Sequence, residues 1–356
     1  MRGISFLIKD YIVTASDAIK IIPTKSKLKK SLGLDIGSFA VKIVELSSSS
    51  DKMSVSAFGT VSIVNLSRQE AADSIKKLLV QSGVTLKEAA ISVSGSSVIE
   101  RFITLPKMDE EALKGAIKFE AEKLIPFDMS ECVIDHKILG GDDRENKISV
   151  LLVAVKKDHL FSRVKLAEEA GLTVRLVDVD MFAAANAFMK CFKNPADKTV
   201  AILNMGASLT NISILRGEGV LFARDLAVGG NDFNSAISRV LSLDAGAAEE
   251  LKLSPGEKIQ DVIGSVKPVL NSLLDEVKLS FSYYENQTGK EIDEIYITGG
   301  GSAIVGLADA FQENFGSKPS VLNPMHFAEI GLAGSDKGPL EKTGSSFTVA
   351  IGLALR

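Results

Sequence analysis

Two short polar turns hold the residue types in this chain that are best suited to bind a phosphate. The first spans residues 35–38 and the second residues 204–208, and in each a polar residue, Asp35 or Asn204, is followed two positions later by a glycine. Glycine lacks a Cβ, tolerates positive φ and lets backbone N–H groups approach an anion closely. A single glycine in a hairpin is ordinarily only a turn residue. Because the pattern occurs twice, we interpret both turns as candidate phosphate-binding sites.

The elements that must position these turns also occur twice. Residues 32–46 and residues 201–215 each contain a short apolar strand, a polar residue, a glycine turn and a second strand with alternating apolar residues. Alternation with a period of two is typical of half-buried strands. The two segments therefore predict two hairpins in two copies of one α/β unit.

Length and composition favour two domains and exclude several functions. A chain of 356 residues with 46% hydrophobic residues exceeds one ordinary core and can fill two. The net charge of −4 provides no broad attraction to nucleic acid. The two cysteines and three histidines are scattered without metal-ligand spacing. We therefore expect neither a disulfide framework nor a metal cage, which fits the reducing cytoplasm.

The first 30 residues form a separate part. The chain contains no uninterrupted apolar run of about 18 residues, so no transmembrane helix is predicted. Residues 4–22 place apolar side chains at helical spacing among charged ones, and a lysine-rich linker follows Pro23. Such a helix could be functional, by lying on an anionic membrane surface or docking on a partner, or it could simply pack back on its own domain or be frayed. Both alternatives stay open.

The hydrophobic patterns divide the rest into two halves and a final helix. We expect a first half at 31–195, a second half at 196–340 and a C-terminal helix at 341–356 that returns to the first half. Strands are expected at 32–36, 41–46, 55–64, 89–93 and 294–298, and helices at 70–82, 232–252, 261–287 and 347–355.

An inserted module is expected within the first half, at about residues 99–175. Its pattern predicts β-α-β-β-α, with strands at 99–105, 132–139 and 148–155 and a last helix at 159–170. Asp109 can cap the first helix of the module and Pro126 can end it.

Three motifs together resemble those of a known superfamily. Residues 35–42, 204–210 and 295–303 resemble the first phosphate, second phosphate and adenosine motifs of the actin-like ATPases. The segments 105–108, 119–127 and 171–180 resemble the PilM family of type IV pilus assembly proteins, which is related to FtsA. The resemblance covers residues 31–356 and implies an actin-like, ribonuclease H-like duplicated α/β fold with an inserted FtsA-type subdomain.

The resemblance implies that ATP or ADP binds with Mg²⁺ between the halves. Backbone amides and small residues would hold the nucleotide, and a carboxylate would hold the metal directly or through water. The residues implied for ATP are Gly37, Ser38, Lys42, Gly206, Ala207, Ser208, Thr210, Gly229, Gly230, Glu249, Lys252, Gly299, Gly300 and Gly301, with Thr298 beside them. Asp35 and Asn204 are implied for Mg²⁺. Glu249 and Lys252 could equally form an i,i+3 ion pair on a helix.

Asn204 departs from the superfamily pattern, which usually has an aspartate there. An amide keeps a hydrogen bond but loses the charge and cannot accept a proton, so turnover should suffer more than binding. We therefore expect slow or absent hydrolysis. Asp180 is the candidate carboxylate for orienting water, although Asp178 and Asp180 could instead be a capping or solvated pair before a helix.

The resemblance also implies partners. The PilM family would bind the cytoplasmic N-terminal peptide of PilN in a groove beside the module, and we place that groove at Ile99, Phe102, Ile125 and Phe127. Core packing is the alternative for these apolar residues. The implied protein is a cytoplasmic scaffold, peripheral to the inner membrane, that contacts other proteins of the pilus or secretion platform and could form oligomers.

Two other functions are compatible with the motifs. A sugar-kinase-type phosphotransferase would need a catalytic aspartate and a sugar-binding loop rich in polar and aromatic residues, yet tryptophan is absent and only four tyrosines occur. A filament-forming ATPase similar to FtsA is the second alternative, since polymerisation surfaces cannot be identified in one sequence.

Overall fold

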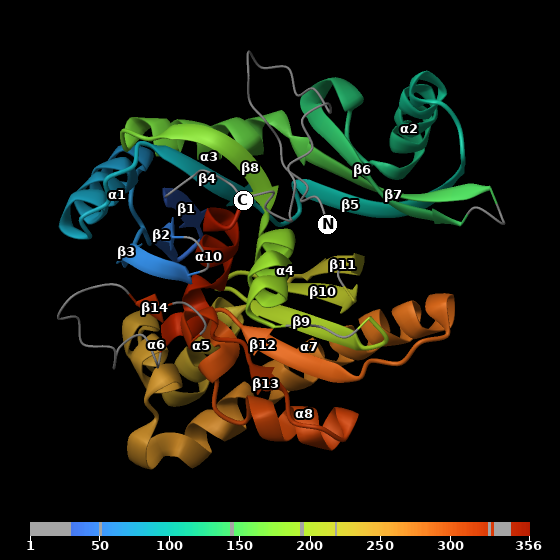
Figure 1. Ribbon diagram of the computed structural model, residues 1–356. Helices are drawn as coiled ribbons and strands as arrows, with labels where there is room; N and C mark the ends of the chain where they lie inside the picture. Colours follow the sequence, from blue (N-terminus) through green and yellow to red (C-terminus); the bar gives the residue numbers. More distant parts are fainter. Residues whose placement is uncertain are drawn as a thin grey trace.

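A computed structural model describes residues 30–49, 52–142, 146–192, 196–217, 219–326, 329–330 and 343–356. The helix and linker expected before residue 30 lie outside the described residues. Within them the chain forms three sheets flanked by helices, and the predicted α/β class is confirmed (Figure 1). No helix in this described part is both long and apolar enough to cross a membrane.

The first sheet has six strands in the order β14-β3-β2-β1-β4-β8. They are β1 (Lys30–Ile36), β2 (Ala40–Ser49), β3 (Lys52–Ser62), β4 (Glu88–Val93), β8 (Thr173–Val179) and β14 (Glu329–Ile330). One face is covered by α1 (Arg68–Gln81) and α3 (Lys157–Glu169), and the other by α4 (Asp180–Cys191) and α10 (Thr348–Ala354). Because both faces are covered, β1 and β4 are nearly continuous runs of buried residues.

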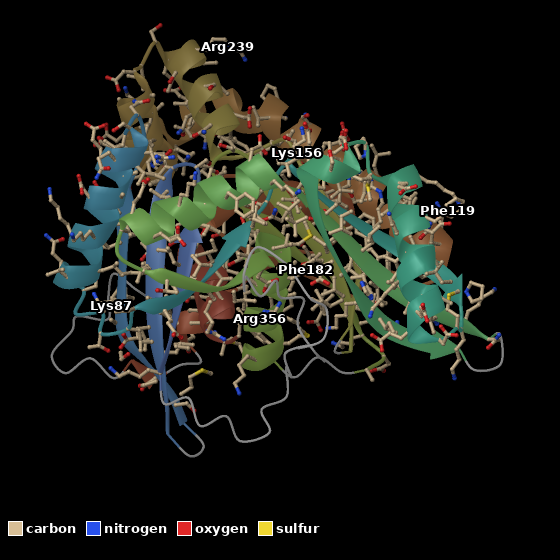
Figure 2. The ribbon with its side chains drawn as sticks, turned by 90° about the horizontal axis from the view of Figure 1, so that it is seen from above. Lys87, Phe119, Lys156, Phe182, Arg239 and Arg356 are labelled. Carbon is tan, nitrogen blue, oxygen red and sulfur yellow. The ribbon has the colours of Figure 1, made fainter. Side chains whose placement is uncertain are left out.

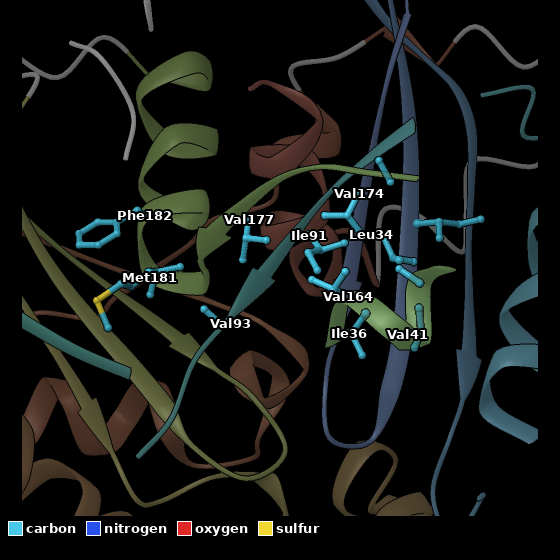
Figure 3. Close-up of a cluster of buried hydrophobic side chains, with 14 of the residues drawn as sticks. Leu34, Ile36, Val41, Ile91, Val93, Val164, Val174, Val177, Met181 and Phe182 are labelled. Atoms are coloured by element: carbon cyan, nitrogen blue, oxygen red, sulfur yellow. The ribbon is translucent and has the colours of Figure 1, made fainter. Parts of the chain in front are cut away.

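The two faces of this sheet are packed differently. Leu34, Ile36 and Ile91 belong to a large apolar cluster that contains Val164 of α3 (Figure 3). On the opposite face a Cβ at Gly33 would lie 2.0 Å from the carbonyl oxygen of Ala350. Glycine at this position therefore lets α10 pack directly against the backbone of β1.

The second sheet has five strands in the order β11-β10-β9-β12-β13. They are β9 (Thr199–Met205), β10 (Thr210–Arg216), β11 (Gly219–Leu226), β12 (Glu294–Thr298) and β13 (Ser320–Val321). Its helices are α5 (Gly230–Leu241), α6 (Ala245–Leu253), α7 (Ile259–Thr288) and α8 (Leu307–Phe315), which share a second apolar core with the sheet.

Helix α4 lies between the two large sheets. It contacts β4 and β8 of the first sheet and β9, β10 and β11 of the second (Figure 1). Its Phe182 is 4% exposed and lies inside the molecule, whereas Lys87, Phe119 and Arg239 lie towards the outside (Figure 2). Since Asp180 is the first residue of α4, this helix places a carboxylate between the two halves of the fold.

The module is a three-stranded sheet in the order β5-β7-β6 with one helix on it. It consists of β5 (Val98–Pro106), α2 (Glu110–Leu124), β6 (Cys132–Asp142) and β7 (Lys147–Lys156). The Asp109 side chain accepts a hydrogen bond from the Ala112 N–H at 2.8 Å, so the predicted cap is confirmed. The fifth expected element, α3, contacts β7 of the module but packs mainly on α1, β4 and β8 of the first half.

Two helical segments also differ from expectation. The helix expected at 232–252 is two helices, because Ser242 adopts the left-handed conformation with φ of 54° and Asp244 caps α6. The last helix is preceded by a 3-10 turn. The 3-10 turns are η1 (Met129–Glu131), η2 (Gly256–Lys258), η3 (Gly300–Ala303), η4 (Pro324–His326) and η5 (Gly344–Phe347).

Candidate functional site

The two glycine turns have the same backbone construction. The Gly37 N–H donates to the carbonyl oxygen of Ala40 at 3.1 Å, and the Gly206 N–H donates to that of Leu209 at 2.9 Å. A Cβ on Gly37 would lie 2.8 Å from the oxygen of Ala40, and one on Gly206 would lie 3.0 Å from that of Leu209. Each turn is thus closed by one hydrogen bond, and in each the glycine permits the close approach.

The tips of the two turns meet across the fold. The Ser208 hydroxyl donates to the Ser38 hydroxyl oxygen at 2.8 Å, and both side chains are exposed. Asn231 at the start of α5 donates to the Ser208 hydroxyl oxygen at 3.4 Å. The structure therefore brings together the residues predicted for phosphate in both turns, namely Gly37, Ser38, Gly206, Ala207 and Ser208.

A charged pair lies beneath the first turn. Asp35 is 5% exposed, and its Oδ2 lies 3.1 Å from the Lys42 Nζ on the opposite strand. Burial raises the pKa of Asp35 above its usual range, Lys42 opposes that shift, and the negative charge of Asp180 adds to it. The predicted first metal residue, the predicted lysine and the predicted water-orienting carboxylate are therefore close enough to act on one another.

A row of amides lies beneath the second turn. Asn204, Asn211 and Asp225 are register partners across β9, β10 and β11. The Asn204 Nδ2 donates to the Asn211 Oδ1 at 2.8 Å, and the Asn211 Nδ2 donates to the Asp225 Oδ1 at 2.6 Å. The Gly95 N–H donates to the other oxygen of Asp225 at 2.7 Å. This row joins the predicted second metal position to the β4–β5 connection.

The donor and acceptor roles in this row are fixed by its last member. An ionised carboxylate can only accept, so the amide nitrogen of Asn211 must point to Asp225 and its oxygen to Asn204. Asn204 is consequently held with its nitrogen towards Asn211. Asn211 and Asp225 were not predicted, because their roles depend on strand register.

The glycines at the start of α5 hold the second turn. The Gly230 N–H donates to the Gly206 oxygen at 2.9 Å and the Asn231 N–H to the Ala207 oxygen at 2.8 Å. A Cβ on Gly229 would lie 2.6 Å from the Ala207 oxygen. These α5 amides are already used within the protein, so the structure gives Gly229 and Gly230 a packing role.

The position of Thr210 also differs from that expected for a phosphate-binding side chain. It is fully buried, and its hydroxyl donates to the Val228 carbonyl oxygen at 2.8 Å. Thr210 thus secures the connection from β11 to α5.

The predicted pair Glu249 and Lys252 forms part of a polar cluster behind α5, in which Lys252 is buried and Glu249 is partly exposed. The Lys252 Nζ lies 2.7 Å from the Glu249 Oε2 and donates to the Gly230 carbonyl oxygen at 3.3 Å. The Asn234 Nδ2 donates to the same Glu249 oxygen at 2.5 Å. The helical ion pair is present, and it also reaches the glycine turn, so both interpretations of this motif remain compatible with the structure.

A pocket of about 590 Å³ opens beside this cluster. It is lined by Asn231, Asn234, Ser235, Ser238, Arg239 and Ala245. The sequence analysis did not identify these residues, since a polar stripe on an amphipathic helix is usually a solvated face. The pocket adjoins the Glu249–Lys252 cluster through Asn234.

The third glycine motif packs against the end of β9. Gly299 has φ of 83°, and a Cβ there would lie 2.5 Å from the Met205 oxygen and 2.7 Å from the Asn204 Oδ1. Gly301 is buried against Met205, whereas Gly300 is exposed and a Cβ on it would meet no atom within 4 Å. Thr298 is buried and bonded to Leu322 and Ser345 carbonyls. This motif therefore lies next to the second turn.

The side-chain oxygens of this site fit Mg²⁺ only when a bound nucleotide supplies further oxygen ligands. Within the described ranges no three His, Cys, Asp or Glu side chains cluster as a metal cage. Mg²⁺ in nucleotide sites commonly takes one or two carboxylates together with phosphate and water oxygens. Asp35 can supply one such oxygen, and Asn204 can supply an amide oxygen.

The four residues predicted for a partner peptide do not share one face of the module. Ile125 is 5% exposed in the module core, which Ile99 and Phe127 also contact. The Lys156 Nζ lies 4.4 Å from the Phe127 ring centroid. Phe102 packs on the opposite side of the sheet against the large apolar cluster. Of the four, Ile99 also lines a second pocket of about 440 Å³ between β5 and β11.

The duplicated hairpins, the helix between the sheets and the inserted module define a protein with the actin-like ATPase fold. The solved structure described as "PilM-PilN type IV pilus biogenesis complex" matches with a TM-score of 0.82 and 29% identity, over 92% of this chain and 98% of that one. The ethanolamine utilization protein EutJ from Carboxydothermus hydrogenoformans matches with a TM-score of 0.57 and 14% identity, over 92% of this chain and 89% of EutJ. The second likeness concerns the fold alone.

The particular family follows from sequence. The family described as "Type IV pilus assembly protein PilM" matches residues 33–356, so the chain belongs to the PilM family. The cell division protein FtsA of Streptococcus pneumoniae is 22% identical over 345 residues, which cover 82% of this chain and 75% of FtsA. The predicted resemblance to PilM and its relation to FtsA are confirmed.

Proposed function

We propose that this protein is a nucleotide-binding scaffold of the inner-membrane platform that assembles type IV pili or a related secretion system. ATP or ADP with Mg²⁺ binds between the two glycine turns, and the module side of the protein binds the cytoplasmic N-terminal peptide of PilN. The protein acts in the cytoplasm, at the membrane surface, beside other platform proteins. Hydrolysis is slow or absent.

The observation that carries the nucleotide site is the meeting of the two turns at Ser38 and Ser208. Two identically built turns supply small residues from opposite halves, so one bound polyphosphate would contact both halves. Lys42 adds a positive charge beside Asp35, which can hold the metal. The 590 Å³ pocket starts at Asn231, which reaches Ser208 of the second turn, and adjoins Glu249 through Asn234, so it could receive the nucleoside.

Slow hydrolysis follows from the second turn. Asn204 carries no charge and is held by Asn211 in one orientation. A bound metal would supply charge to the phosphates, but phosphoryl transfer also needs the attacking water to be positioned. Asp180, between the halves, is the remaining carboxylate for that role.

The nucleotide proposal is tested by mass analysis of ligand released from the purified protein, with a Mg²⁺-dependent phosphate-release assay. We expect bound ATP or ADP and little release of phosphate. Gly300→Val should abolish binding without unfolding, because a side chain there meets open space where the nucleoside would lie. Gly115→Val, at an equally open position on α2, is the matched control. Absence of adenine nucleotide binding in the wild type would reject the nucleotide site. Rapid release of phosphate by the wild type would reject the proposal that hydrolysis is slow.

The partner proposal rests on family membership and on the name of the similar solved complex, which contains PilM with PilN. Fluorescence anisotropy of a labelled PilN N-terminal peptide tests it with the full chain. Saturable binding, unchanged in Phe119→Ser on the exposed face of α2, would support the proposal. No binding to nucleotide-loaded or nucleotide-free protein would reject PilN as the partner.

A further inference from the structure

Two sheet edges face each other across the 440 Å³ pocket. β5 is an edge strand of the module sheet, β11 is an edge strand of the second large sheet, and the two are in contact. The pocket between them is also lined by Gly95 and Ser96 of the β4–β5 connection and by Ser208 of the second turn. Edge strands carry backbone N–H and C=O groups that can pair with an extended chain.

The pocket contains a buried carboxyl group with an unsatisfied oxygen. Glu100 of β5 is only 8% exposed, and its Oε1 has no hydrogen-bond partner among the described residues. Val98 and Phe102, the register neighbours on the same face of β5, both contact the large apolar cluster. A buried carboxylate in apolar surroundings is unfavourable unless a donor or a positive charge reaches it.

A second carboxylate lines the same pocket. Asp225 accepts one hydrogen bond at each oxygen, from Asn211 and from the Gly95 N–H. Each carboxylate oxygen can accept more than one bond, so Asp225 keeps acceptor capacity. Its negative charge, after burial, is the second cause that raises the pKa of Glu100 to about 8.

The two arginines that line the pocket are engaged elsewhere. The Arg224 Nη2 lies 2.7 Å from Glu276, and its Nη1 donates to Ser280. The Arg101 Nη1 donates to the backbone carbonyl of Glu100, and Arg101 is exposed. Neither arginine is hydrogen-bonded to the side chain of Glu100 or Asp225, so the pocket holds two carboxyl groups without a bonded cation among the described residues.

We propose that this pocket binds a basic side chain, a guanidinium or an ammonium, of an extended partner peptide, with Glu100 and Asp225 as its acceptors. The unpartnered Glu100 oxygen, the acceptor capacity of Asp225 and the two flanking strand edges favour this occupant. The inference rests on the proposed function in taking a peptide as the partner. It adds a specific charged contact that none of the four predicted apolar residues could provide.

Binding of a cation has a measurable consequence for Glu100. The groups acting on it are Asp225 from β11, Asp180 from α4 and Arg101 from its own strand. Since the pKa of Glu100 is about 8, its carboxyl group is mostly protonated at pH 7. A cation favours the ionised form, so binding at pH 7 releases a proton.

The pocket is tested first without any peptide. Carbon-13 NMR of glutamate carboxyls in the full chain, with the Glu100 signal assigned by Glu100→Gln, gives its titration midpoint. N-methylguanidinium should lower that midpoint, whereas tetramethylammonium, which has no hydrogen-bond donor, should not. An unchanged midpoint, or equal binding of N-methylguanidinium to Glu100→Gln, would overturn the inference.

The peptide is tested second, by calorimetry in buffers of different ionisation enthalpy. The PilN peptide should release a proton on binding at pH 7 and bind Glu100→Gln on the order of tenfold more weakly. Neutralising the basic side chains of the peptide one at a time should cause the same loss at one of them, and Glu111→Gln on exposed α2 is the control. Binding without proton release and without dependence on Glu100 would reject this contact but keep PilN as partner. Absence of binding would reject PilN as the partner. The NMR titration would still show whether the pocket binds a cation.

Discussion

The two hairpins of this protein have the same register but opposite chemistry. In the first, Asp35 stands across from Lys42, and in the second Asn204 stands across from Asn211. The first pair is a buried ion pair, and the second is a pair of amides whose charge lies one strand further out, on Asp225.

The comparison explains why Asn204 is not simply a neutral version of Asp35. Lys42 donates to Asp35, whereas Asn211 accepts from Asn204, because its own donor is used by Asp225. The direction of the hydrogen bonds is thus reversed between the two rows. The amide nitrogen of Asn204 now donates to the Asn211 side-chain oxygen. A carboxylate at position 204 would place a second acceptor against that oxygen, and no hydrogen bond could form between the two.

The largest predicted effect comes from removing the cation of the first row. Lys42→Met leaves Asp35 buried without its counter-charge, which should lower the free energy of unfolding at pH 7 by about 3 kcal/mol. This is the lower end of the range for a broken buried pair, since the Lys42 side chain is 21% exposed. Urea unfolding monitored by circular dichroism measures the loss.

The matched control is the double variant Lys42→Met with Asp35→Asn. Neutralising the buried carboxylate should recover most of the stability, because no uncompensated charge remains. A double variant as unstable as Lys42→Met alone would mean that packing of the lysine stem, and not its charge, stabilises the hairpin.

The second effect concerns the end of the amide row, where the charge of Asp225 acts on Glu100. Burial, reinforced by that charge, raises the pKa of Glu100 from an ordinary 4.5 to about 8. The folded protein therefore holds a proton that the unfolded chain has lost at pH 5–7, and stability falls as pH rises from about 4.5 towards 8.

Glu100→Gln should remove this fall. Each unit of pKa shift corresponds to about 1.4 kcal/mol, but a buried amide also loses hydration, so we expect the variant to be roughly 2–3 kcal/mol more stable than the wild type at pH 9. Near pH 4.5 the variant should instead be roughly 2 kcal/mol less stable than the wild type, because the cost of burying the amide remains while the gain from the pKa shift is absent. Thermal unfolding across this pH range, with Glu111→Gln as control, checks the sign, and a constant difference at every pH would contradict it.

The third prediction concerns a variant that reverses the direction of the hydrogen bonds in the second row. Asn204→Asp should destabilise the protein by about 2 kcal/mol, because either the new carboxylate faces the Asn211 oxygen or Asn211 flips and faces Asp225 with its oxygen. Adding Asp225→Asn lets every group in the flipped row find a partner, so the double variant should regain stability. A double-mutant cycle from urea unfolding gives the coupling free energy between positions 204 and 225. Additive losses would mean that the two positions are not coupled through Asn211.

The same double variant sharpens the proposed chemistry. It places a carboxylate at position 204, matching Asp35 of the first turn, within a fully bonded row. We expect faster Mg²⁺-dependent phosphate release than in the wild type if nucleotide binds between the turns. A folded double variant that binds nucleotide and releases no more phosphate would show that Asn204 does not limit turnover.

Local patterns predicted the first row better than the second. Asp35 and Lys42 are seven residues apart around a glycine turn, so hairpin geometry alone pairs them. Asn204 was identified as a departure because the superfamily that this motif resembles usually has an aspartate at that position. Asp225, however, reaches the row only through the pairing of β10 with β11, which contains an irregularity at Ile214 and Leu215 that no pattern reveals.

The roles of several residues depend on side-chain burial and tertiary packing, which the sequence pattern does not reveal. Thr210 has the residue type of a phosphate ligand, yet it is fully buried and bonded within the fold. The helix at 157–169 had the right periodicity, but which sheet it covers depends on tertiary packing. Glu100 interrupts an apolar run without strict alternation, so its inward orientation could not be predicted.

The smallest predicted effect concerns the single contact between the two turns. Ser208→Ala removes the hydrogen bond to Ser38 at an exposed site, so the free energy of unfolding should change by only about 0.5 kcal/mol. Ser38→Ala removes the same bond from the other side, and the double variant should be no less stable than either single one. Because both hydroxyls stand where the two turns meet, nucleotide affinity should fall in each variant, measured by calorimetry with ATP and Mg²⁺. A fall in affinity for one serine only would mean that the two turns, although built alike, do not contribute equally to the site.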